Sequence, residues 1–538
     1  MNKNKRTAAR RNGHTATRSA LAARPTLAST KLIAIAAAVS LAGGMAAGAG
    51  TAYVARRTGT TANANTSMMM GGMGGGADTM SYDYSGSYTA ALTADGKEVT
   101  SSDDTTATDA DQNATLAQNG GTLTITDATL TKSGNSDNAD NNNFYGTNSI
   151  SLTVGDDSKT VISGSTLTAS SSGSNGVFAT DSGTALVYDT TISTTSDNSR
   201  ALDATYSGTI LAGKITADTA GDHSATVATD RGGGNVSVTD SELSTAGSGS
   251  PLLYSTGDVQ VNNVTGTASG SQIAGMEGYN TILISNSTLE STNTGKTGSD
   301  PIANGVIIYQ STSGDAESST GEHATFQAKD STLKSAIESG SMFYFTNTTA
   351  DVVLSNTTLD FDTSKATLIN ASGNDSNNWG SAGSNGATVT FTGRSQTLEG
   401  DVTADTISSV DLYLLEGSTW TGAASITENA SAANGSTSDA PITVNVDGTS
   451  TWVVTEDTTI SALNVASGGK IVDENGDTVT IVANGKTVVS GDSDITVTVT
   501  GSYSTTVDAG SDTELADETI DRSDFDSQFG TSTSWTMA

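Results

Sequence analysis

The 538-residue sequence contains no cysteine and only four prolines. Without cysteine the chain has no disulfide framework and no thiolate ligand for a metal. Stability must therefore come from the stacking of apolar side chains and from hydrogen bonding.

Basic residues are scarce outside the first part of the chain. Ten of the 24 Lys and Arg residues lie at or before Arg57, while the first acidic residue is Asp78. The 14 basic residues that remain stand against 58 acidic ones, which gives a net charge of −44. Such a negative field repels phosphates and anionic lipid, so we expect no nucleic-acid partner.

The leader, residues 1–57, contains an uncharged apolar run over 32–55 with basic residues on both sides. Twenty-four apolar residues suffice to span a bilayer, and the basic excess before them predicts that the N-terminus stays inside the cell. We expect either a transmembrane signal-anchor helix or a cleaved signal peptide. Both alternatives predict export. A signal-anchor helix would hold the protein at the cell surface through its membrane contact, and cleavage would release it to the extracellular medium. Residues 58–100, rich in Gly, Met, Ser and Thr, are predicted to be a linker.

A repeated phrase runs through the middle of the chain. It reads apolar, any residue, apolar, any residue, then Asp, Asn or Gly, two polar residues and a closing apolar residue. Repeats of this kind predict a solenoid in which each unit buries its apolar side against its neighbours. The phrase occurs with identical offsets at Leu123/Ile125/Asp127/Leu130, Val236/Val238/Asp240/Leu243, Ile282/Ile284/Asn286/Leu289, Phe326/Ala328/Asp330/Leu333 and Val352/Leu354/Asn356/Leu359.

The phrase predicts a parallel β-helix, an all-β fold. Its alternation is the period of a half-buried strand, and its Asp/Asn/Gly position suits a corner with a left-handed backbone. Most repeats are 22 to 26 residues long, and a second, more apolar strand follows in each, as at 177–179 and, in one of two longer repeats, at 306–309. We predict the β-helix over 101–425, β-rich coils or a cap over 426–510, and a partly disordered acidic tail over 511–538.

Several segments resemble a known family. The chain is similar to bacterial adhesin-like surface proteins that have a pectate-lyase-like right-handed β-helix. This resemblance implies export and a right-handed coil, which is also the general expectation for parallel crossovers. It supplies no catalytic residues. The similar segments are the Gly/Met-rich spacer and residues 118–125, 228–234, 254–258 and 308–316.

The best candidate for a binding patch is Asp203, Tyr206, Asp230 and Arg231, which fall at nearby positions of successive repeats. Carboxylates and an arginine on one face could bind an acidic sugar, with or without Ca²⁺. The structural alternative is that Arg231 neutralises a stack of carboxylates beside a glycine-rich corner.

Tyrosines recur in most successive repeats, among them Tyr254, Tyr309 and Tyr344. If they were exposed along one face they could stack on sugar rings, whereas a buried aromatic stack is the structural alternative. The acidic turns at 156–157 and 473–477 make Ca²⁺ a candidate ligand, although a solvated turn explains them better. We predict no metal site and no catalytic residue.

We therefore predict an exported, non-catalytic cell-surface β-helix with an adhesin-like or structural role. Its partner would be a host or cell-surface glycan or protein. The alternative is an extracellular polysaccharide-binding protein or polysaccharide lyase that uses a Ca²⁺/Arg site on one face of the β-helix.

Overall fold

The computed structural model describes residues 81–311, 323–376, 379–433 and 435–538. The chain divides into two units, 1–39 and 40–538, and all the described residues belong to the second. The predicted leader, its apolar run 32–55 and most of the predicted linker lie outside the described residues. Within those residues, no helix has the length and the apolar character needed to cross a membrane.

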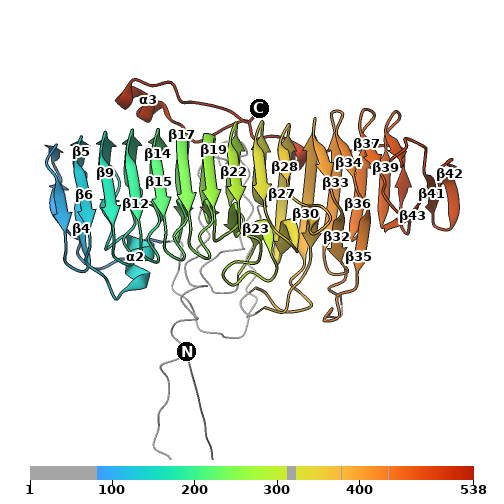
Figure 1. The fold of residues 1–538 in the computed structure, drawn as a ribbon, viewed down its shortest axis with the longest axis horizontal. Coiled ribbons are helices and arrows are strands. Elements are labelled where there is room, and N and C mark those ends of the chain that lie inside the picture. Colours follow the sequence, from blue (N-terminus) through green and yellow to red (C-terminus); the bar gives the residue numbers. More distant parts are fainter. Residues whose placement is uncertain (1–80, 312–322, 377–378, 434) are drawn as a thin grey trace, which may run out of the picture. The chain divides into compact units, whose positions relative to one another are not determined.

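The described residues form stacks of parallel strands, so the predicted all-β parallel β-helix is confirmed (Figure 1). One turn of the β-helix is called a coil below. The first sheet has 13 strands: β1 (Thr89–Asp95), β4 (Gln112–Gln118), β7 (Ser151–Val154), β10 (Val177–Thr180), β13 (Leu202–Ala204), β16 (Val227–Thr229), β18 (Leu253–Ser255), β20 (Ala274–Glu277), β23 (Asn304–Tyr309), β26 (Ser341–Thr346), β29 (Thr367–Ala371), β32 (Val402–Asp405) and β35 (Ala424–Thr427).

The second sheet has 23 strands and is bent at a corner in each coil. Before the corner lie β2 (Glu98–Ser101), β5 (Thr122–Thr126), β8 (Lys159–Ser163), β11 (Thr184–Tyr188), β14 (Gly208–Gly213), β21 (Thr281–Ser285), β24 (Ala324–Lys329), β27 (Thr348–Ser355), β30 (Ala387–Arg394), β33 (Ser409–Leu415), β36 (Ile442–Val446), β39 (Ala462–Val465) and β44 (Tyr503–Ser504). After it lie β3 (Thr105–Ala107), β6 (Thr129–Lys132), β9 (Thr166–Ala169), β12 (Thr191–Thr194), β15 (Thr216–Thr219), β22 (Thr288–Ser291), β25 (Thr332–Ser335) and β28 (Thr358–Asp360). Two long strands, β17 (Gly234–Thr245) and β19 (Asp258–Ala268), continue through the corner.

The repeated phrase works because equivalent residues of successive coils stack. Ile125 pairs with Ile162, which in turn pairs with Val187, and all three side chains are fully buried. The stacking extends into a single apolar cluster that runs along the coils. Each coil thus buries its apolar side against the next one, which is how solenoids are stabilised.

The Asp/Asn/Gly position is a left-handed corner, as predicted. The backbone φ angle is 53° at Asp127, 52° at Asp240 and 45° at Asn356. Asn356 also donates from Nδ2 to Oδ1 of Asp330 in the preceding coil, at 2.6 Å. Asp and Asn tolerate this conformation better than other side chains do, and their amides and carboxylates link neighbouring corners.

The C-terminal region both continues the coils and caps them. A four-stranded parallel sheet extends the stack, with Trp420 and Trp452 stacked in the core at 4.7 Å between ring centroids. A second four-stranded sheet then ends in the antiparallel pair β41–β42, which covers the open end. The extending strands are β31 (Thr397–Glu399), β34 (Thr419–Thr421), β37 (Thr451–Val453) and β40 (Lys470–Val472), and the capping strands are β38 (Thr458–Ile460), β41 (Thr480–Ala483), β42 (Lys486–Val489) and β43 (Thr496–Val499).

Two predicted boundaries differ from the structure. Strand β1 and most of strand β2 lie inside the stretch predicted as linker, because alternating residues of β1 such as Leu92 and Ala94 pack on the core. The acidic tail, predicted to be partly disordered, contains a 3₁₀ turn η1 (Ser511–Thr513) and a helix α3 (Ser523–Phe529). The tail packs on the β-helix through Phe525 and Arg522, which are both fully buried. The acidic composition of the tail gave no sign of this anchoring role.

Candidate functional site

The candidate site lies on the outer face of the 13-stranded sheet. Leu202 and Ala204 of β13 point into the apolar core, so Asp203 between them points outward. In the same outward column Asp203 has Phe178 of β10 on one side and Ala228 of β16 on the other. Asp203 and Asp230 are nevertheless fully buried.

A short helix, α2 (Ala139–Tyr145), contributes to this site and comes from an insertion between β6 and β7. The side chain of Asn138 caps its start by accepting a hydrogen bond from the Asn141 amide at 3.1 Å, and Gly146 ends it with a φ of 71°. A Cβ at position 146 would lie 2.6 Å from the ring of Phe178, so glycine lets the helix approach the sheet closely. Phe144 is fully buried.

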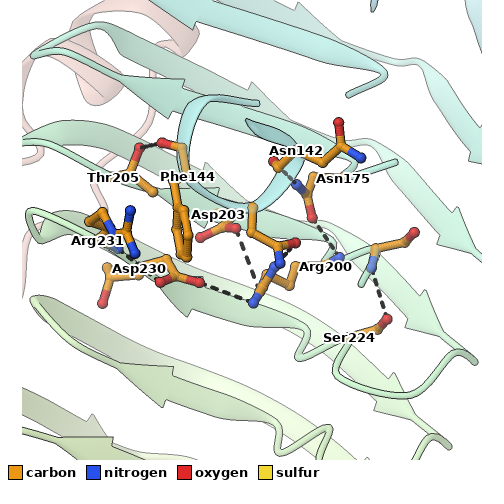
Figure 2. Close-up of polar contacts among 12 residues, drawn as sticks. Asn142, Phe144, Asn175, Arg200, Asp203, Thr205, Ser224, Asp230 and Arg231 are labelled. Atoms are coloured by element: carbon orange, nitrogen blue, oxygen red, sulfur yellow. Dashed lines mark hydrogen bonds and ion pairs between the residues drawn. The ribbon is translucent and has the colours of Figure 1, made fainter. Parts of the chain in front are cut away.

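Arg200 connects α2 to the two carboxylates (Figure 2). Its Nη2 lies 3.0 Å from Oδ2 of Asp230, and its Nε lies 3.6 Å from Oδ2 of Asp203. Its Nη1 donates to Oδ1 of Asn143 in α2 at 3.0 Å. This role of Arg200 was not predicted from the sequence, although its position three residues before Asp203 was a usable signal.

Two further hydrogen bonds attach α2 to the sheet. The hydroxyl of Thr205 donates to the carbonyl oxygen of Phe144 at 2.9 Å, and Nδ2 of Asn175 donates to the carbonyl oxygen of Asn142 at 3.2 Å (Figure 2). The network of Arg200, Asp203, Asp230 and Asn143, called the Arg200 network below, thus lies where α2 docks.

Arg231 packs against α2, and its charge also favours the ionised form of Asp230. Its guanidinium carbon lies 3.7 Å from the ring centroid of Phe144, as a cation–π contact, and its backbone N–H donates to Oδ1 of Asp230 at 2.9 Å. The ion pairs to Asp203 and Asp230 described above are those of Arg200. Asp230 and Arg231 are neighbours in the sequence, and the sequence alone gave no information on where each side chain points.

The buried carboxylates hold their protons more tightly than exposed ones do. Burial raises the pKa of both Asp203 and Asp230, and the nearby Arg200 only partly opposes this. Neither oxygen of Asp203 accepts a hydrogen bond, although both are buried. One guanidinium therefore serves two carboxylates, one of which has little other stabilisation.

Tyr206 lies beside this network in an aromatic cluster. Its ring stacks on Tyr145 of α2 at 5.6 Å between centroids, with 2° between the ring planes. Tyr82 packs edge-on against the same ring at 5.5 Å. Tyr206 is 4% exposed, so its ring packs inside this cluster.

Tyr254 and Tyr344 share the outward column of Asp203 further along the sheet, and Tyr309 lies in the neighbouring column. The Tyr254 hydroxyl donates to Oε2 of Glu277 at 3.3 Å, and the Tyr309 ring packs on Trp379 at 4.1 Å. Tyr309 and Tyr344 are 4% and 1% exposed. All three tyrosines thus lie outside the interior of the coils. Tyr309 and Tyr344 are nevertheless buried, on the outer face of the 13-stranded sheet.

Glu277, at the end of β20, was not among the residues predicted from the sequence. Its burial raises the pKa to about 8, although hydrogen bonds from Ser311, Tyr309 and Tyr254 oppose the shift. It places a third buried carboxyl group on this face. An acidic residue at an outward strand position, in Ala274–Glu277, was the available signal.

In the acidic turn at 473–477, the Asp473 carboxylate accepts hydrogen bonds from the backbone of the turn itself. Oδ1 of Asp473 accepts from the amides of Asn475 and Asp477, and Oδ2 accepts from the Ser493 hydroxyl. Across the described ranges, no group of three or more His, Asp and Glu side chains is arranged to hold a metal ion.

Comparisons with protein families, with curated proteins and with solved structures gave no match. The adhesin-like resemblance therefore stays a prediction based on the motifs quoted above.

Proposed function

We propose that the protein is an exported cell-surface β-helix with an adhesin-like or structural role and no catalytic activity. The basic leader, the apolar run 32–55 and the acidic remainder support export. The observation that carries the adhesin-like role is a repetitive polar flank on the strands that follow the corner.

That flank contains a column of threonines. In successive coils Thr129, Thr166, Thr191, Thr216, Glu242, Thr265, Thr288, Thr332 and Thr358 pair in register; all are exposed except Thr332, which is half-buried. The eight threonines of this set are called the threonine column below. Members on adjacent strands lie about 4.8 Å apart, and Glu242 separates Thr216 from Thr265.

A column of this kind suits polyvalent recognition. Each threonine offers one hydroxyl and one methyl group, so each contact with a ligand is weak, but the contacts repeat at fixed spacing. The exposed corner residues Asp127, Asp189 and Asp240 run beside the column. A host or cell-surface glycan or protein with repeated donor groups could bind several coils at once, and linked weak contacts give high avidity.

In the patch predicted from the sequence, Asp203 and Asp230 are buried. Their burial favours the threonine column as the contact surface. A ligand for Asp203 or Asp230 would have to displace the groups that bury them. Because Arg200 and Arg231 both contact residues of α2, displacing that helix would break the Arg200 network and the cation–π contact together.

A second candidate function is polysaccharide binding or cleavage at the outer face of the 13-stranded sheet. The buried carboxyl groups of Asp203, Asp230 and Glu277, together with Tyr254, favour this candidate, because perturbed acids cluster at functional sites. Release of unsaturated products from acidic polysaccharides, measured with and without Ca²⁺, would support a lyase.

Two experiments test the proposed function. Protease treatment of intact cells should digest the protein if it is displayed, and a protein digested only after lysis would contradict surface display. The soluble fragment 81–538, applied to a glycan array, should bind at least one glycan class, and Thr265→Arg should weaken that binding. The control Thr487→Arg places the same charge on the exposed β42 of the cap and should leave binding unchanged.

A further inference from the structure

The C-terminal segment 509–538, called the strap below, runs back over the outer face of the 23-stranded sheet (Figure 1). Its hydrogen bonds reach coils far away in sequence and in the stack. They run from Arg394 Nε to the Thr513 carbonyl at 2.7 Å, from the Ala516 amide to Gln327 Oε1 at 2.8 Å, from the Ile520 amide to Gln260 Oε1 at 2.8 Å and from Lys159 Nζ to Asp524 Oδ2 at 2.7 Å.

The chain then turns at α3 and returns. Lys329 Nζ donates to the carbonyl oxygen of Met537 at 2.8 Å, and Met537 is fully buried. The strap therefore contacts the coils between β30 and β8.

Arg522 anchors the strap in a socket made by β14 and β17. Its Nη1 donates to the carbonyl oxygen of Ser237 at 2.8 Å, and its Nη2 donates to the carbonyl oxygen of Ala212 at 2.9 Å. The hydroxyls of Ser237, Thr239 and Thr533 accept its remaining hydrogen bonds. Burial lowers the pKa of Arg522 to about 10, which still leaves it charged at neutral pH.

Phe525 fills an apolar pocket next to that socket. It packs against Val161, Leu186 and Leu211, which point outward from the sheet. Gly213 makes room for the ring, because a Cβ there would lie 2.8 Å from Phe525 Cζ. A glycine and three outward apolar residues, at positions where neighbouring coils carry polar ones such as Ser237 and Gln260, make a pocket fitted to this ring.

The strap docks as a bound peptide would. After β44 none of its described residues joins a sheet, and its contacts are made by side chains and by single backbone groups. The socket and pocket belong entirely to coils that precede the strap by about 280 to 365 residues. Nothing in these contacts requires that the strap and the socket belong to the same copy of the chain.

We propose that the strap is an exchangeable docking element, and that the socket of one copy accepts the strap of a second copy. The roughly 18 residues from Ser504 to Arg522 reach about 60 Å when extended, at roughly 3.3 Å per residue. The contacts are identical whether the strap docks on its own copy or on a second copy. The concentration of the protein therefore decides between the two arrangements, as in domain swapping. This inference does not depend on the ligand or the location of the protein.

Two complementary variants of the full chain test the exchange. Gly213→Leu blocks the Phe525 pocket but keeps an intact strap, and Arg522→Ala keeps an intact socket but has a defective strap. Each variant alone should be monomeric in light scattering. Their equimolar mixture should form a 1:1 dimer, because only the mixture contains both a working strap and a free socket.

A labelled peptide of residues 509–538 gives a second readout. It should bind the Arg522→Ala chain but not the wild-type chain, whose socket is occupied. Peptides with Arg522→Ala or Arg522→Lys should bind at least about ten-fold more weakly, because both lose the forked donor geometry.

The proposal is overturned if the Arg522→Ala chain is folded by circular dichroism yet binds no wild-type peptide, and if the mixture of variants remains monomeric. It is also overturned if Arg522→Ala prevents folding, because the strap would then be an integral part of each copy.

Discussion

Replacing Asp203 by Asn should stabilise the docking of α2 at neutral and alkaline pH. Arg200 serves two buried carboxylates, and Asp230 is the closer one, at 3.0 Å against 3.6 Å. The network is therefore either net negative in a buried position or partly protonated. The amide of Asn leaves a neutral Arg200–Asp230 pair and removes the carboxylate that accepts no hydrogen bond.

The sign of the pH dependence follows from the raised pKa of Asp203. A carboxyl group whose pKa is higher in the folded state than in the unfolded state binds more protons when folded. The folded protein is therefore progressively destabilised as the pH rises. The loss begins at about pH 4, the pKa of this carboxyl group in the unfolded chain, and continues up to its pKa in the folded protein. The amide side chain of the Asp203→Asn variant does not titrate, so the variant should lose this part of the pH dependence.

The magnitude follows from the same linkage. Each unit of pKa difference corresponds to about 1.4 kcal/mol, and an unfavourably buried carboxylate costs several kcal/mol. Since Asn brings its own unpaired amide, we expect a net stabilisation of roughly 1–3 kcal/mol at pH 8 and close to none at pH 4.

Hydrogen exchange of residues 133–150 together with urea unfolding, each at pH 4 and pH 8, measures the effect. Asp157→Asn is the matched control, because Asp157 is exposed and its φ of 61° also suits Asn. A variant that is less stable than wild type at pH 8, or equally improved at both pH values, would refute the reasoning about Asp203.

Three further substitutions test other parts of the structure. Asp230→Ala should destabilise the site by about 1–3 kcal/mol in urea unfolding, because Arg200 loses its closer hydrogen-bond partner while Asp203 remains 3.6 Å away; an unchanged midpoint would show that Arg200 is solvated. Trp420→Ala should lower the free energy of unfolding by about 3–5 kcal/mol, since it removes one ring of a buried stack. The control is Thr449→Ala on an exposed turn, and a smaller loss for Trp420→Ala than for this control would contradict the prediction. Asp240→Val should cost more than Asp240→Gly in thermal unfolding, because a β-branched residue opposes the left-handed corner; equal costs would show that the corner relaxes.

The repeat made most of the fold predictable. Ile125, Ile162 and Val187 occur at equal offsets because they stack in one column, and Asp127 and Asp240 recur because each coil needs a left-handed corner. These are local requirements that return in every coil, so a single sequence contains many copies of the same signal.

The candidate site was less predictable because its contacts occur once. Spacing placed Asp203 and Asp230 on one face, but the docking of α2 over them depends on Asn143 and Phe144, which belong to an insertion with no repeat. Arg200 and Arg231 are chemically equivalent in the sequence, and only the direction of each side chain decides which one pairs with Asp203 and Asp230.

The strap was hidden for a related reason. Its contacts join residues more than a hundred positions apart, and its acidic composition resembles that of a disordered tail. One signal was present on the other side of the contact: Ala185, Leu186 and Val187 form an unbroken apolar run in a strand that should alternate. The middle residue of such a run points outward and therefore requires a cover, which Phe525 supplies.

The most direct test of the account compares ligand binding by two variants of the fragment 81–538 on the same glycan array. We predict that Arg231→Ala keeps the binding of the unsubstituted fragment, because Arg231 contacts Phe144 of the docked α2, and that Thr265→Arg loses it. Loss of binding in Arg231→Ala together with retention in Thr265→Arg would contradict the account and place the ligand on the outer face of the 13-stranded sheet.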